Sequence, residues 1–175
     1  YTTLFRSMAS RIAVMNKGLL QQLDTPQVLY DKPANLFVAG FIGSPAMNFF
    51  PMKLRRVGEN LHVESKTMDI KLPKEATATY AKQVGKDVIF GIRPDDIHNP
   101  DFAPSNIHGE KVEATVDVTE LMGNEIYVYL VSGAVNFCAR VDPRSRYKLG
   151  EKVSMLFNMD NIHIFDPSVN AEYPP

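Results

Sequence analysis

The sequence predicts a mainly β protein with a short α/β segment at its N-terminal end. From residue 48 onward, short apolar runs alternate with turn residues, which is the pattern of an all-β domain. The clearest example is 112–118, where valine and alanine alternate with charged and polar residues, so that one strand face is buried and the other meets water. Before residue 44, a hairpin signal and helix caps replace this pattern. The 175 residues therefore favour a small domain with an appendage over one large core.

Composition and charge exclude several classes of protein. With 45% hydrophobic and 22% charged residues the chain is globular, and its formal net charge of -1 gives no general attraction for nucleic acid or anionic lipid. The single cysteine, Cys138, cannot form an internal disulfide, and no nearby histidine or cation cluster would make it a reactive thiol. No histidine has a second ligand at metal spacing, and the apolar runs are too short to cross a bilayer. We therefore expect a cytoplasmic protein without a metal site that reaches a membrane only through another subunit.

The N-terminal appendage begins with a predicted hairpin over residues 11–23. Two apolar runs flank the tripeptide Asn-Lys-Gly at 16–18, which is a good two-residue turn signal. Thr25 precedes Pro26, and a threonine N-cap followed by proline is typical of a helix start. A short helix is therefore expected through Tyr30.

A second helix is predicted over residues 36–42. Asn35 is its expected N-cap, and the tripeptide Gly-Ser-Pro at 43–45 ends it. The helix has almost no polar side chain, so we expect other surfaces to cover it on both sides.

The rest of the chain is expected to form strands separated by polar or glycine-containing turns, with one helix among them. The predicted strands are 48–57, 61–64, 68–72, 87–92, 112–118, 126–131, 135–141, 153–157 and 162–165, and the predicted helix is 75–84.

The strand 126–131 is apolar on both faces, as expected of a strand that packs against a second surface outside its own barrel. The inward side chains would be Ile126, Val128 and Leu130, and the outward ones Tyr127, Tyr129 and Val131. Tyrosine suits an interface in which its hydroxyl stays wet, so the outward set is a candidate dimer face. The alternative is that a helix of the same domain covers it.

A first family resemblance lies in the linker after the second helix. The run ANLFVAGFIGSPAMNFF over 34–50 resembles the segment that joins the nucleotide-binding domain to the C-terminal regulatory domain in ATPase subunits of sugar ABC importers, the maltose-importer ATPase family. The linker motif residues are Gly43, Ser44, Pro45, Met47 and Asn48.

A second resemblance lies at 91–97, GIRPDDI, which is similar to a motif of the regulatory domain of the same ATPases. That domain is an oligomer-binding-like β-barrel known as the TOBE domain. The motif residues are Gly91, Ile92, Arg93, Pro94 and Asp95. Pro94 would end the strand while Arg93 and Asp95 pair or cap backbone groups. We favour a structural corner over a binding site. Adjacent carboxylates such as those of Asp95 and Asp96 could suggest acid/base chemistry, but on an extended chain they would point to opposite sides, and a solvated turn is the expected arrangement.

The resemblance implies a division of the chain and a function. Residues 8–43 would be the C-terminal remnant of an ABC nucleotide-binding domain with its linker helix, and 44–175 the TOBE regulatory domain, whereas 1–7 fit nothing in the family and are expected to be non-native. The function implied is the regulatory and dimerisation portion of the ATP-binding subunit of a carbohydrate importer. Its partners would be a second copy of the subunit, across a two-fold axis, and membrane permease subunits at the inner face of the cell membrane.

Catalysis is not expected of these residues. The sequence contains no phosphate-binding loop of the form GxxxxGK[ST], no Leu-Ser-Gly-Gly-Gln signature, no apolar strand ending in paired acidic residues and no switch histidine. We therefore predict no catalytic, cofactor-binding or metal-binding residue here, with ATP and magnesium bound elsewhere in the parent subunit.

The alternative function is a stand-alone barrel that binds a small oxyanion, a sugar or nucleic acid. A nucleic-acid interface would require a basic groove with exposed aromatics. The 19 basic residues are balanced by 20 acidic ones and form only small clusters, so nucleic acid is not an expected partner.

Overall fold

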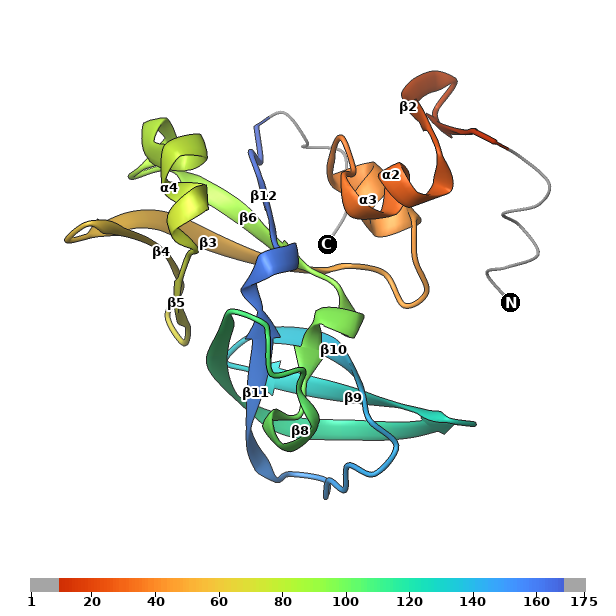
Figure 1. The fold of residues 1–175 in the computed structure, drawn as a ribbon, viewed down its shortest axis with the longest axis vertical. Coiled ribbons are helices and arrows are strands. Elements are labelled where there is room, and N and C mark those ends of the chain that lie inside the picture. Colours follow the sequence, from red (N-terminus) through yellow and green to blue (C-terminus); the bar gives the residue numbers. More distant parts are fainter. Residues whose placement is uncertain (1–9, 169–175) are drawn as a thin grey trace. The chain divides into compact units, whose positions relative to one another are not determined.

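The computed structural model describes residues 10–168 and forms two compact units (Figure 1). One unit comprises residues 1–47 and 167–175, and the other runs from residue 48 to 166. The predicted mainly β class is confirmed. Residues 1–7, expected to be non-native, lie outside the described residues, and the predicted domain boundary between 43 and 44 stays a prediction. Within residues 10–168, no helix is long and apolar enough to span a membrane.

The first unit contains the predicted hairpin and the two predicted helices. Its elements are β1 (Ile12–Asn16), β2 (Leu19–Asp24), α2 (Pro26–Asp31) and α3 (Leu36–Phe41). In the turn between β1 and β2, Lys17 and Gly18 both have positive φ angles, 48° and 81°, as a two-residue turn of the I′ type requires. This geometry confirms the hairpin.

Both helix caps form as the sequence predicts. The Thr25 hydroxyl accepts a hydrogen bond from the Val28 N–H at 3.3 Å, and the Asn35 side-chain oxygen accepts one from the Val38 N–H at 2.9 Å. The expectation that α3 is covered on both sides is wrong, because Phe41 is 66% exposed while Val38 is fully buried. The helix is too short for its apolar residues to be divided between two packed faces.

The second unit holds two five-stranded sheets. One has the order β12-β6-β3-β4-β5 and the other β10-β9-β8-β11-β7, and every neighbouring pair is antiparallel. The first sheet is formed by β3 (Asn48–Val57), β4 (Asn60–Glu64), β5 (Asp69–Lys71), β6 (Asp87–Ile92) and β12 (His163–Phe165). The second is formed by β7 (Ile97–His98), β8 (Gly109–Met122), β9 (Glu125–Ser132), β10 (Val135–Val141) and β11 (Lys152–Asn158). The helical elements are α4 (Lys74–Tyr80), η1 (Ala81–Gln83), η2 (Pro94–Asp96), η3 (Pro100–Phe102) and η4 (Met159–Asn161).

The β8–β9 hairpin is longer than the sequence predicts. The register shifts between Val116 and Val118, so that Asp117 has no partner on β9. Beyond this bulge β8 continues to Met122, and Gly123, with a φ of +70°, turns the chain. Figure 1 shows β8 and β9 running side by side to a common tip. The predicted strands end at 118 and resume at 126, but Leu121 pairs with Ile126 within the hairpin.

One hydrophobic core joins the two sheets of the second unit. Four phenylalanines lie at its centre, with ring centroids 5.4 to 6.5 Å apart in the contacting pairs. They are Phe50, Phe90, Phe137 and Phe157, and each is no more than 4% exposed. Because two come from each sheet, the sheets cannot separate without exposing all four rings.

The first unit should be much less stable than the second. Its described core contains only three fully buried side chains that pack together, Val14, Leu29 and Val38, while Leu19 is 69% exposed. In amide hydrogen exchange, we expect residues 11–30 to be nearly unprotected and residues 112–165 to be protected, because local opening costs little where few apolar contacts are lost. Equal protection in the two segments would contradict this expectation.

Candidate functional site

Asn48, from the linker motif, holds two sheets together. It is buried at the start of β3, where its side-chain Nδ2 donates to the Cys138 carbonyl oxygen at 2.8 Å. In return the Cys138 N–H donates to the Asn48 Oδ1, also at 2.8 Å. Since β10 is the outer strand of its sheet, the asparagine amide takes the place of a neighbouring strand for one residue. A structural role for Asn48 therefore follows from its contacts.

The other linker residues shape the backbone that leads to β3. Gly43 has a φ of +122°, the Ser44–Pro45 peptide bond is cis, and Met47 is buried. A φ of this size is left-handed backbone that suits glycine.

Cys138 is shielded by the same arrangement. Its side chain is 7% exposed, and burial raises the pKa of the thiol to about 11. At neutral pH the thiol is therefore almost wholly protonated, which agrees with the expectation that this cysteine is unreactive.

Replacing Asn48 by alanine should destabilise the second unit by about 2 kcal/mol, because two hydrogen bonds are lost and the Cys138 backbone groups remain buried without partners. Urea denaturation followed by circular dichroism measures the change. Asn136→Ala on β10, where the side chain is exposed, is the matched control and should change stability by less than about 0.5 kcal/mol. If the two variants unfold alike, the amide bridge carries no stability.

The second motif forms a corner between β6 and β7. Gly91 and Ile92 end β6, Arg93 is buried, and Pro94 begins the 3-10 turn η2. Asp95 lies in this turn, and its Oδ1 is 2.8 Å from the Arg140 Nε on β10.

Asp96 faces a different part of the unit. Its Oδ1 accepts hydrogen bonds from the side-chain amides of Asn158 at 2.9 Å and Asn161 at 2.7 Å. Burial raises the pKa of Asp96, and the two amides and His98 partly oppose that rise. Asp95 and Asp96 both belong to η2, so the predicted turn forms here, although the chain within it is not extended. The proline fixes a φ that suits a tight turn, and the two carboxylates consequently reach different strands.

The candidate dimer face lies on β9. Val128 and Leu130 are fully buried, while Tyr129 is 36% exposed and Tyr127 and Val131 are half-buried. The Tyr127 hydroxyl donates to Glu125 at 3.4 Å and the Tyr129 hydroxyl to Glu120 at 3.3 Å. Val118 is directly opposite Tyr129 on β8, so it shares this face and adds a further exposed apolar side chain.

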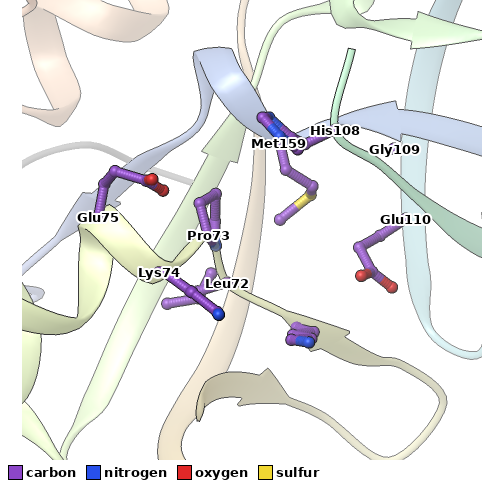
Figure 2. A pocket seen from close by; sticks show the side chains of 9 residues that line it. Leu72, Pro73, Lys74, Glu75, His108, Gly109, Glu110 and Met159 are labelled. Atoms are coloured by element: carbon purple, nitrogen blue, oxygen red, sulfur yellow. The ribbon is translucent and has the colours of Figure 1, made fainter. Parts of the chain in front are cut away.

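A hollow of about 350 Å³ was not foreseen from the sequence (Figure 2). It is lined by residues from the end of β5 and the start of α4, from the start of β8, and from η4. These residues are Lys71, Leu72, Pro73, Lys74, Glu75, His108, Gly109, Glu110 and Met159. No local pattern marks them, because they come from three segments far apart in the sequence.

His108 at the rim of this hollow is paired with Asp160. Its Nδ1 is 2.6 Å from the Asp160 Oδ1, and its backbone N–H donates to the Oδ2 at 3.1 Å. This hydrogen bond and the carboxylate charge raise the pKa of His108, and the same contacts lower the pKa of Asp160. The hollow therefore carries a histidine that is more cationic near neutral pH than an isolated one.

We predict that Asp160→Asn lowers the pKa of His108, because it removes the carboxylate charge. An NMR titration of the His108 ring protons measures this pKa. The pair should stabilise the fold fully below the ordinary histidine pKa of 6.5, and lose that contribution as pH rises through the raised pKa of folded His108. Asp69→Asn, which removes the 2.8 Å partner of His62 instead, is the control. An unchanged His108 pKa in Asp160→Asn would refute the pairing.

Two family models match the second unit together with the five linker residues that precede it, 43–47. The model described as "MalK OB fold domain" matches residues 43–97, and that described as "TOBE domain" matches residues 90–165. The fold and the two motifs thus define an OB-fold and TOBE protein, and the predicted fold class is confirmed.

Three relatives with similar sequences are ATP-binding proteins of importers. The chain is 44% identical over 163 residues to the trehalose/maltose import ATP-binding protein MalK of Thermococcus litoralis, and 42% identical over 163 residues to the osmoprotective compounds uptake ATP-binding protein GgtA of Synechocystis. It is 39% identical over 160 residues to the oligosaccharides import ATP-binding protein MsmX of Bacillus subtilis. Each match covers 91% of this chain but 43% of the relative, so the chain spans less than half the length of these proteins. Together, the two family models and these relatives support a resemblance to the C-terminal part of sugar-importer ATP-binding subunits.

A solved structure shares the fold. The cytoplasmic molybdate-binding protein ModG, in its molybdate-bound form, superposes with a TM-score of 0.50 at 15% identity, covering 69% of this chain and 96% of that one.

Proposed function

We propose that this chain is the regulatory and dimerisation portion of the ATP-binding subunit of a carbohydrate ABC importer. The observation that carries the proposal is the pair of adjoining matches that together span residues 43–165, the first to the OB domain of MalK and the second to TOBE. The relatives named above import trehalose and maltose, osmoprotective compounds or oligosaccharides, and a carbohydrate is the substrate class most of them share.

In this proposal, ATP is bound and hydrolysed by a part of the subunit other than the described residues. The sequence has no phosphate-binding loop, so ATP and magnesium would be bound by the nucleotide-binding domain of the subunit. That domain would also contact the permease subunits and hold the protein at the cytoplasmic side of the membrane. The alternative of a stand-alone ligand-binding barrel lacks a counterpart to the linker match, which only the importer assignment explains.

We further propose that two copies associate through the outer face of β9. The face combines Tyr127, Tyr129 and Val131 with the exposed Val118, and its tyrosine hydroxyls are held by glutamates on the same sheet. Such a face buries aromatic rings while its polar rim stays wet. A symmetric pair would use the same residues from both copies.

Sedimentation equilibrium on the full chain tests this association. We expect a weak dimer with a dissociation constant in the range of about 10 to 300 μM, because a small interface without other domains binds weakly. The double variant Tyr127→Ser, Tyr129→Ser should weaken it at least about tenfold, since large aromatic side chains commonly dominate such interfaces.

Val57→Ser is the matched control, because Val57 is 42% exposed at the end of β3 in the other sheet. A native chain that stays monomeric at several hundred micromolar, or a double variant that dimerises as well as the control, would show that the face is wrong.

A further inference from the structure

The hollow in Figure 2 has an apolar floor and a charged rim. Leu72 and Met159 lie beneath the hollow, 1% and 2% exposed, and the half-buried Pro73 presents apolar surface to it. All three belong to the second unit, where the end of β5 lies beside the start of β8 and η4. Such an apolar surface can contact the C–H face of a sugar ring, which needs no hydrogen-bond partner there.

Four rim side chains are available to a ligand. Lys71, Lys74, Glu75 and Glu110 make no side-chain hydrogen bond or ion pair with any of residues 10–168, although the charge of Glu75 acts on His108. Figure 2 shows Lys74 and Glu110 reaching the hollow from different elements, on opposite sides of it. His108 adds a third donor, oriented by its bond to Asp160.

This arrangement selects a ligand by its chemistry. Lysine ammonium groups attract a phosphate or carboxylate, and a glutamate carboxylate accepts hydrogen bonds from hydroxyl groups while repelling a bare anion. The volume of about 350 Å³ is near the lower end of small-molecule pockets and suits a single sugar ring.

We propose that this hollow binds a hydroxylated organic anion of monosaccharide size, either a sugar phosphate or a sugar acid. Lys71 and Lys74 hold the anionic group, Glu110 accepts from the hydroxyls, and the ring lies against Pro73. The site shares no residue with the two family motifs or with the β9 face. It goes beyond the importer proposal and does not rest on it, so failure of one leaves the other standing.

The test is an NMR titration of the full, isotopically labelled chain with glucose 6-phosphate. We expect saturable shifts confined to residues 71–75, 108–110 and 159, with half-saturation below about 10 mM. Glucose and inorganic phosphate, titrated separately, should each bind at least about tenfold more weakly, because each lacks one half of the recognition. Gluconate distinguishes the two anionic groups: comparable binding assigns a general hydroxylated anion, and tenfold weaker binding assigns the phosphate.

Variants locate the site. Lys71→Ala and Lys74→Ala should each weaken glucose 6-phosphate binding about tenfold, and Glu110→Ala should weaken it while leaving inorganic phosphate binding unchanged or stronger. Lys152→Ala, an exposed lysine at the start of β11, is the matched control and should bind as the native chain does. The proposal is overturned by an absence of shifts at 20 mM, by equal binding of inorganic phosphate, or by equal effects of Lys152→Ala and Lys74→Ala.

Discussion

The packing of four phenylalanines between the two sheets is the contact on which the second unit depends. Phe50 contacts Phe90 within its own sheet and both Phe137 and Phe157 across the core, at ring-centroid distances between 5.4 and 6.0 Å. Such tilted and edge-on pairs contribute about 0.5 to 1.5 kcal/mol each beyond their burial.

Polar and backbone contacts then fix how the sheets meet around that core. The amide of Asn48 joins the start of β3 to the edge strand β10, and Asp95 joins η2 to Arg140 of the same strand. At the far end of β9, the turn at Gly133 lies against Thr67 so closely that a Cβ there would be 2.5 Å from the threonine methyl group. Since Gly133 also has a φ of +62°, that turn requires glycine for two independent reasons. The aromatic core thus sets the spacing of the sheets, and these contacts set their register.

The sequence predicts those features that depend on near neighbours. The turn at Lys17 and Gly18, the two helix caps and the alternation in β8 each follow from residues within a few positions of one another. The features that the sequence did not predict depend instead on residues far apart in the sequence. The bulge at Asp117 lengthens the hairpin only because β9 accepts the shifted register, and the exposure of Phe41 depends on which side of a short helix is packed. A local sequence pattern contains no information about such tertiary contacts. The hollow depends on them most, because its lining comes from three segments far apart in the sequence.

The contacts of the two family motifs also limit where this chain can act. The carboxylate of Asp95 is engaged by Arg140, that of Asp96 by two asparagine amides, and the amide of Asn48 by a backbone pair. A ligand that recruited any of these groups would have to break a bond that joins two elements of the unit, and for the buried Asn48 this would cost about 1 to 3 kcal/mol. Surfaces whose polar groups are not engaged in this way require no such loss. Among the described residues, Lys71 and Lys74 at the rim of the hollow meet that condition, and the β9 face offers the rings of two tyrosines whose hydroxyls can keep their glutamate partners. Association and ligand binding are therefore placed there, and the motifs are interpreted as structure.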